Sequence, residues 1–255
     1  MPTFNVTKAA TSCALTLSGF FTFVRRPNVE IVEELSVCEK TTTGIWLFIL
    51  SLAVTVMLGV LALPLILATD LTIGEQLSEA LGGSIWSNIL SVVLLGPLVE
   101  EIIFRGWLSG TSRAALASAL SLAVIYGGSA VLDPYFAEGG AFKPLFIVVG
   151  AIAILFVLSP LDGANRIIGF ERAFPAIFYT QAVVFGTLHF QNYAASSVTI
   201  AILATLPLIA CGVIWGYARI RLGFASAVML HAAYNVPAAF GSIILIQSAA
   251  HLSPP

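Results

Sequence analysis

The sequence predicts an all-α polytopic membrane protein, a transmembrane helical bundle of about seven spans with an N-terminal interfacial helix. Two observations carry this prediction. Hydrophobic residues make up 58% of the 255 residues and charged residues only 9%, whereas soluble domains carry about 25% charged residues. The charges also gather in short segments between long charge-free stretches. A soluble domain of this composition would expose a nearly continuous apolar surface and aggregate.

The spans follow from the lengths of the charge-free stretches. A helix needs about 20 apolar residues to cross the roughly 30 Å hydrocarbon layer. The stretch 173–218 is long enough for two crossings and is interrupted by polar residues near Gln191 and Ser197. The predicted spans are 45–68, 85–110, 114–132, 143–160, 174–192, 197–218 and 224–249.

The segment before the first span differs in character. Residues 7–24 are mildly amphipathic and end at Arg25 and Arg26, which is typical of a helix lying in the membrane interface. We therefore divide the chain into a cytoplasmic or interfacial segment, residues 1–43, and one transmembrane domain, residues 44–255. The bilayer is the expected surrounding, and a net charge of −2 gives no basic surface for nucleic acid.

The basic residues predict the orientation. Ten of the eleven lysines and arginines precede the first span or follow the second, fourth and sixth spans, and only Lys143 lies on the opposite side. Cytoplasmic loops carry such an excess of basic residues. We therefore expect a multi-pass integral membrane protein whose N-terminus is cytoplasmic, which in a bacterium means the inner membrane.

Three places break the apolar pattern inside the spans, where an ionisable residue marks a functional site by default. The first is Glu100-Glu101 followed by Arg105. Glu101 and Arg105 are spaced i,i+4, so they share a helix face and favour an ion pair, while Glu100 points about 100° away. A carboxylate in an apolar site suits a general base. The alternative is that these charges only mark the cytoplasmic end of the span.

The other two breaks carry histidines. His189 follows Phe185 by four residues in the fifth span, and His231 precedes Asn235 by four residues in the seventh. The side chains of His231 and Asn235 therefore project from the same helix face and need polar partners. A histidine or asparagine in a membrane helix also serves as an interhelical packing residue, which is the alternative for these positions.

The depths of the three motifs agree. Glu100 lies 13 residues from Arg113, His189 lies 17 from Arg172, and His231 lies 10 from Arg221. At about 1.5 Å per residue, these separations correspond to roughly 20, 25 and 15 Å from the cytoplasmic side. One shared intramembrane site requires such a common layer.

In this order, Glu100-Glu101-x-x-x-Arg105, Phe185-x-x-x-His189 and His231-x-x-x-Asn235 resemble the CPBP family, which contains CAAX prenyl endopeptidases and bacteriocin-processing and immunity proteins. The form EExxFRG at residues 100–106 is the most specific of the motifs. The resemblance covers residues 100–235. Glu101 and His189 are 88 residues apart, which is longer than the spacing in the family, and the spans 114–132 and 143–160 account for the excess.

The resemblance implies an intramembrane endopeptidase acting on a membrane-associated protein or peptide. By analogy, Glu100 and His189 would activate a water molecule, His231 and Asn235 would stabilise the oxyanion, and Glu101 and Arg105 would support Glu100. The same set could instead hold Zn²⁺ through Glu100, His189 and His231, since carboxylate and imidazole are good zinc ligands. Because HExxH is absent, we expect catalysis without a cofactor.

Two other functions stay open on the residues alone. A non-catalytic membrane partner or immunity protein would share the fold, and a transporter would also bury carboxylates and histidines along its pathway. The clustering of the polar residues in three motifs favours the protease.

Overall fold

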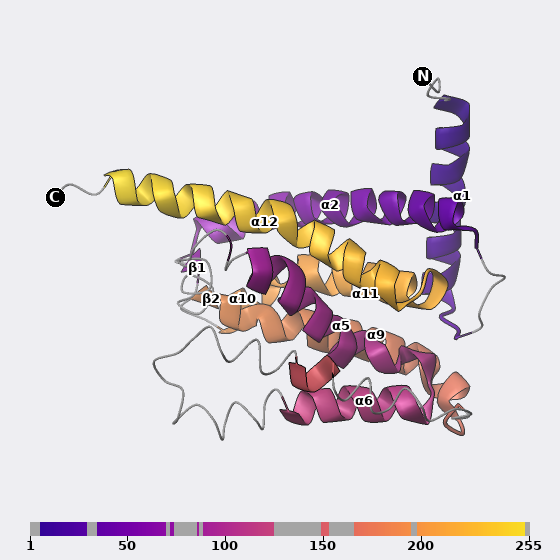
Figure 1. The fold of residues 1–255 in the computed structure, drawn as a ribbon. Helices are drawn as coiled ribbons and strands as arrows, with labels where there is room; N and C mark the ends of the chain where they lie inside the picture. The colour runs from indigo at the N-terminus through magenta and orange to yellow at the C-terminus, as the bar shows by residue number, and fades with distance from the viewer. Residues whose placement is uncertain are drawn as a thin grey trace. The chain divides into compact units, whose positions relative to one another are not determined.

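A computed structural model of the chain describes residues 6–29, 35–69, 72–73, 86, 89–124, 149–152, 166–194 and 198–252 (Figure 1). Its elements are helical apart from one pair of two-residue strands. The chain divides into two compact units. Unit 1 comprises residues 1–74 and 172–230, and unit 2 comprises residues 75–171 and 231–255.

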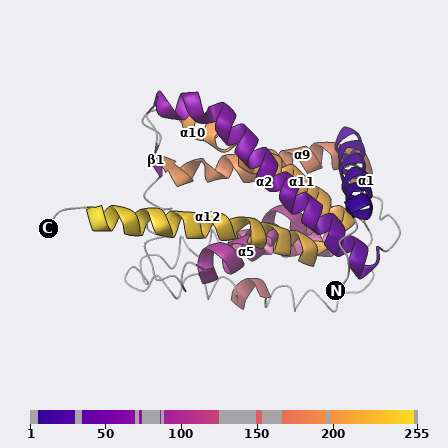
Figure 2. The same cartoon turned by 90° about the horizontal axis from the view of Figure 1, so that it is seen from above.

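Unit 1 is built from long helices and the short strand pair. Its elements are α1 (Val6–Arg25), α2 (Val37–Leu67), β1 (Thr72–Ile73), most of α9 (Phe170–Leu188), the 3₁₀ turn η5 (His189–Asn192), β2 (Tyr193–Ala194), α10 (Val198–Ala204), α11 (Leu206–Arg221) and the start of α12 (Phe224–Leu252). The strands are antiparallel and pair Thr72 with Ala194 and Ile73 with Tyr193. Figure 2 shows α2 lying across α11.

The core of unit 1 is aromatic where α1 meets the other helices. Phe23 packs edge-to-face on Phe178 of α9 and on Tyr217 of α11, with ring centroids 5.1 Å apart in both pairs. Each such pair adds about 0.5–1.5 kcal/mol beyond the burial of its area. These contacts hold α1 against α9 and α11.

Small residues bring α9 and α11 close together. A Cβ on Gly212 would lie 3.1 Å from the Cα of Ala182, and one on Gly186 would lie 2.3 Å from Ile209 Cγ1. Membrane helices associate through such small residues because they let the backbones approach. The packing fixes the end of α9, from which His189 extends.

Unit 2 contains the first predicted motif. Its elements are the π-helix η1 (Ile89–Leu95), α5 (Gly96–Arg105), the 3₁₀ turn η2 (Gly106–Ser109), α6 (Ser112–Leu122) and the part of α12 from His231 onward. Gly110 ends η2 in the left-handed region, with φ at 73°, and Thr111 caps α6 by accepting a bond from the Ala114 N–H.

A side chain on α6 fixes α5. The Ser118 hydroxyl donates to the Ile102 carbonyl at 2.7 Å. Gly106 makes this approach possible, because a Cβ there would lie 2.7 Å from Ser118 Oγ. The helix that bears Glu100 and Glu101 is therefore held by α6.

The helices agree with the predicted segments over the described part of the chain. Helices α1 and α12 cover the predicted 7–24 and 224–249. Helix α2 covers the predicted 45–68 as far as Leu67, and α9 together with η5 covers 174–192. The segment 85–110 is not one regular helix, because it passes through π, α and 3₁₀ geometry. Residues 125–132 of the span 114–132 lie outside the described residues, as does most of 143–160.

The number of crossings stays a prediction. By length and composition, two of the described helices can cross a membrane, Val37–Pro64 and Phe170–Asn192. The pair α10 and α11, bent by 42°, is a third candidate within these residues. The predicted span 197–218 is therefore two helices, α10 and α11, joined at a bend.

The contact between Gly186 and Ile209 gives a first prediction. We expect Gly186→Ala to lower the stability of the detergent-solubilised protein by about 1–3 kcal/mol, because its Cβ meets the Ile209 side chain and backbone. A thermal unfolding scan measures the effect. Gly59→Ala is the matched control, because a Cβ there meets nothing within 4 Å. Equal midpoints for the two variants would contradict the close packing of α9 and α11.

Candidate active site

A distorted stretch of helix carries the first motif. Helix α5 continues directly from η1, since Leu95 at the junction has helical dihedral angles, φ −74° and ψ −44°. Pro97 is fully buried in the first turn of α5. π-helical turns are rare and frequently lie at functional sites. The distortion immediately precedes the two glutamates.

Glu101 and Arg105 form a buried ion pair. The Arg105 guanidinium donates through Nη1 to Glu101 Oε1, and neither side chain is exposed to solvent. A guanidinium keeps its charge in proteins, so the pair places a fixed positive charge beside Glu101. The i,i+4 spacing predicted this pair, and the structure confirms it. Arg105 also lies in the last turn of α5, where a positive charge is favourable.

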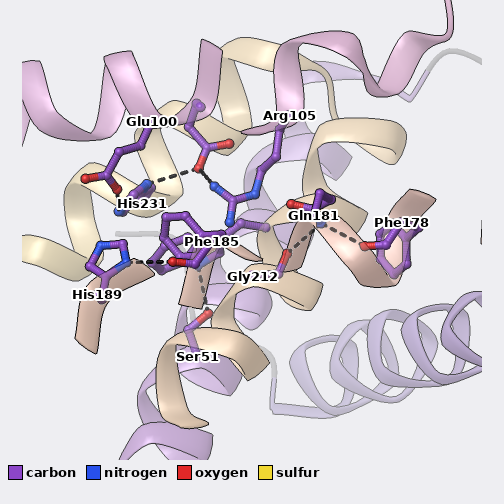
Figure 3. Close-up of polar contacts among 11 residues, drawn as sticks. Ser51, Glu100, Arg105, Phe178, Gln181, Phe185, His189, Gly212 and His231 are labelled. Atoms are coloured by element: carbon purple, nitrogen blue, oxygen red, sulfur yellow. Dashed lines mark hydrogen bonds and ion pairs between the residues drawn. The ribbon is translucent and has the colours of Figure 1, made fainter. Parts of the chain in front are cut away.

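The same Glu101 oxygen binds His231 of α12. His231 Nδ1 lies 3.0 Å from Glu101 Oε1, and the histidine is 2% exposed (Figure 3). Because a carboxylate only accepts hydrogen bonds, Nδ1 carries the proton and donates it to Glu101. The carboxylate thereby fixes the orientation of the ring and which nitrogen is protonated.

This orientation directs the other ring nitrogen toward Glu100. His231 Nε2 lies 3.5 Å from Glu100 Oε2, within ion-pair range and longer than a strong hydrogen bond. The Glu100 side chain is 30% exposed, in contrast to the fully buried Glu101. The two neighbouring glutamates therefore have different environments, one in a closed ion pair and one partly open.

Asn235 lies one helical turn after His231 and also binds the first motif's segment. Its Nδ2 donates to the Val92 carbonyl of η1 at 2.9 Å. The i,i+4 spacing predicted one face for His231 and Asn235, and both side chains contact the segment 89–105. Asn235 contacts this segment at η1, and His231 contacts it at α5.

His189 belongs to unit 1, where it begins η5 directly after α9. Its Nδ1 lies 2.7 Å from the Phe185 carbonyl, and its ring packs edge-to-face on Phe185 with centroids 4.7 Å apart (Figure 3). A carbonyl accepts and cannot donate, so Nδ1 carries a proton here too. In the neutral ring, Nε2 is then the nitrogen that can accept a proton.

Phe185 is itself fixed by a chain of contacts in unit 1. Its ring is fully buried and lies 5.8 Å from the Trp215 ring, whose indole N–H donates to Ser51 of α2 at 3.3 Å. The FxxxH spacing in the sequence therefore has a physical basis. Phe185 both supplies the carbonyl that orients His189 and anchors the end of α9.

Five of the six predicted residues come together in unit 2: Glu100, Glu101, Arg105, His231 and Asn235. Their proximity is observed, whereas their catalytic roles stay predictions. Sequence analysis missed the Val92 carbonyl, because a main-chain group gives no residue-type signal. The proline four residues before Glu101 was the available sign of an irregular helix.

The three residues of the zinc alternative belong to both units: Glu100 and His231 lie in unit 2 and His189 lies in unit 1. Among the residues the structure describes, no group of three or more histidine, cysteine, aspartate or glutamate side chains is arranged to hold a metal ion. In unit 2, Glu101 Oε1 is occupied by Arg105 and His231.

Comparison with known proteins agrees with the motifs. The family model described as type II CAAX prenyl endopeptidase Rce1-like matches residues 82–237, more than half of the chain. The matched region contains all six predicted site residues and confirms the resemblance to the CPBP family. No curated protein and no solved structure matches.

The buried ion pair gives a second prediction. We expect Arg105→Ala to cost about 3–5 kcal/mol of stability, because it leaves the Glu101 carboxylate buried without its counter-charge. Arg166→Ala is the matched control. Arg166 pairs with Glu171 in the same unit, but their side chains are 33% and 69% exposed, so the loss should be about 1 kcal/mol or less.

Unfolding of both variants in detergent measures the difference. The double variant Glu101→Met with Arg105→Met should recover part of the loss, because it removes both charges together. A double variant less stable than Arg105→Ala would contradict the explanation by uncompensated charge.

Proposed function

Since the chain belongs to the type II CAAX prenyl endopeptidase Rce1-like family, we propose that it is an intramembrane endopeptidase. Its substrate is a membrane-associated protein or peptide, in which it hydrolyses a peptide bond. The observation that carries this proposal is His231, held through Nδ1 by the buried Glu101 so that Nε2 faces the partly open Glu100. Ionisable side chains inside a membrane segment are energetically costly and mark a functional site by default.

In the proposed reaction, Glu100 is the general base. Its carboxylate takes a proton from a water molecule while the water oxygen attacks the substrate carbonyl carbon. The C–N bond then breaks, and the same proton passes to the leaving amine. His189 assists by accepting a hydrogen bond from the water at Nε2, which the bond from Nδ1 to Phe185 leaves as the acceptor. Such general base catalysis contributes about 10²–10⁴-fold.

His231 and Asn235 stabilise the oxyanion that forms on the substrate carbonyl. His231 donates to the oxyanion from Nε2, and the bond from Nδ1 to Glu101 orients its ring. Asn235 donates from its amide one turn further along α12. Each such donor is worth about 10²–10³-fold in kcat. Arg105 pairs with Glu101 and so acts through Glu101 rather than on the substrate.

The membrane arrangement belongs to the same proposal. The family and the long apolar helices make the chain an integral membrane protein. We propose that it crosses the membrane several times with its N-terminus in the cytoplasm, because ten of its eleven basic residues fall on that side of the predicted spans. Protease protection of the N-terminal segment in sealed vesicles reports the orientation.

The reaction also proceeds without a metal in this proposal. The support is the absence of HExxH from the sequence and the contacts that Arg105 and His231 make with Glu101 Oε1. Metal analysis of the active protein tests it. Stoichiometric Zn²⁺ whose removal abolishes turnover, and whose return restores it, would overturn the metal-free reaction.

The experiment is a cleavage assay in proteoliposomes. Internally quenched peptides ending in a cysteine–aliphatic–aliphatic–variable sequence are offered with and without a prenyl group on the cysteine. We expect Glu100→Ala and His189→Ala each to lower kcat by about 10²–10⁴-fold, because the attacking water loses its base or its orienting acceptor. The matched controls are Glu171→Gln, an exposed glutamate, and His251→Ala, the third histidine of the sequence.

The controls should stay within twofold of the wild type. Wild-type turnover in both Glu100→Ala and His189→Ala would contradict the assigned roles. A wild-type protein that binds these peptides and cleaves none would favour the non-catalytic membrane partner instead. Cleavage of only the prenylated peptides would identify the lipid as part of the substrate.

A further inference from the structure

The π-helix η1 and Pro97 together create an opening in the helical hydrogen-bond pattern. In π geometry, each carbonyl accepts from the N–H five residues later. The carbonyl of Val92 would then accept from residue 97, but proline has no N–H to donate. The sequence thus deprives Val92, about two helical turns before Glu100, of its regular helical donor.

Asn235 supplies a donor at this place. Its Nδ2 lies 2.9 Å from the Val92 carbonyl, across a separation of 143 residues in the sequence. A buried carbonyl without a partner is costly in a membrane, where water cannot replace the donor. The bond therefore joins α12 to η1 at the point where the helix lacks its own hydrogen bond.

This bond also constrains the amide. The Nδ2 group carries two protons, and the bond to Val92 commits one of them. The amide plane is then fixed, because the side chain can no longer rotate freely about its last torsion. The direction of the second N–H follows from that plane.

We propose that Pro97 is a positioning residue for the hydrolysis. Because proline has no N–H, the Val92 carbonyl is left to accept the hydrogen bond from Asn235. The amide held by this bond presents its second N–H to the oxyanion. The kinetic part of this inference rests on the proposed function. The structural part, the linkage between residue 97 and Asn235, does not.

The test is a double-mutant cycle between Pro97→Ala and Asn235→Ala in the full-length protein. An alanine at 97 restores an N–H, so the helix can satisfy the Val92 carbonyl internally. Pro64→Ala is the matched control, because Pro64 also lies inside a helix, α2, and its side chain is exposed. Thermal unfolding in detergent and the kcat and KM of peptide cleavage are measured for each variant.

For stability, we expect Asn235→Ala to lower the unfolding midpoint by about 2–4 °C in the wild-type background. In the Pro97→Ala background, the same change should lower it by less than about 1 °C. Pro97→Ala alone should shift the midpoint by less than about 2 °C, because the regained helical hydrogen bond offsets the packing lost with the buried proline ring.

For kinetics, we expect Pro97→Ala to lower kcat by about tenfold with KM within twofold, since the released amide loses part of an oxyanion contribution of about 10²–10³-fold. Pro64→Ala should leave both constants unchanged. A variant of nearly unchanged stability and KM but lower kcat distinguishes positioning from a merely structural role.

Two results would overturn the inference. Equal losses of midpoint for Asn235→Ala in both backgrounds would show that residue 97 and Asn235 are not linked. A wild-type kcat in Pro97→Ala would show that the anchor does not position the amide. If the wild type cleaves no peptide, the proposed function fails, while the midpoints still decide the linkage.

Discussion

The site in unit 2 depends on one buried carboxylate, Glu101. It accepts a hydrogen bond from the Arg105 guanidinium within α5 and from His231 on α12, and it is fully shielded from solvent. Burying an ion pair does not by itself stabilise a protein, because both charges lose their hydration. Here the Glu101–Arg105 pair also orients a third side chain, His231. Arg105 holds Glu101 Oε1 in place, and the same oxygen keeps the His231 ring in one orientation.

The irregular helix that carries this pair is held in place by two other helices. The chain passes from π to α to 3₁₀ geometry between Ile89 and Ser109. α12 contacts this segment at two places one turn apart, through Asn235 at Val92 and through His231 at Glu101. Ser118 of α6 holds the same segment at Ile102. The backbone bearing the two glutamates is thus fixed by hydrogen bonds from two other helices.

The sequence predicted those parts of the site that depend on local periodicity. Helical spacing of four residues placed Arg105 beside Glu101 and put Asn235 on the same helix face as His231, and both relations are observed in unit 2. The partners of His231 could not be predicted, because nothing local links residue 231 to residues 100 and 101. The anchoring carbonyl of Val92 was equally hidden, since every residue has one.

The fold likewise has features that the sequence predicted and features that it did not. Apolar length predicted the long helices α2, α9 and α12, because a run without charges has few alternatives in a membrane. It did not predict that 85–110 changes helix type or that α10 and α11 are bent by 42°. Those features depend on Pro97 and on packing between helices, which hydropathy does not record.

The central claim is that Glu101 holds the proton on His231 Nδ1, and nitrogen NMR tests it most directly. Protein labelled with ¹⁵N in its three histidines is compared with His231→Ala, to assign the signal, and with Glu101→Gln. The account predicts a protonated Nδ1 at residue 231 in the wild type and a changed Nδ1 signal in Glu101→Gln. An unprotonated Nδ1 in the wild type, with the proton on Nε2 alone, would contradict it.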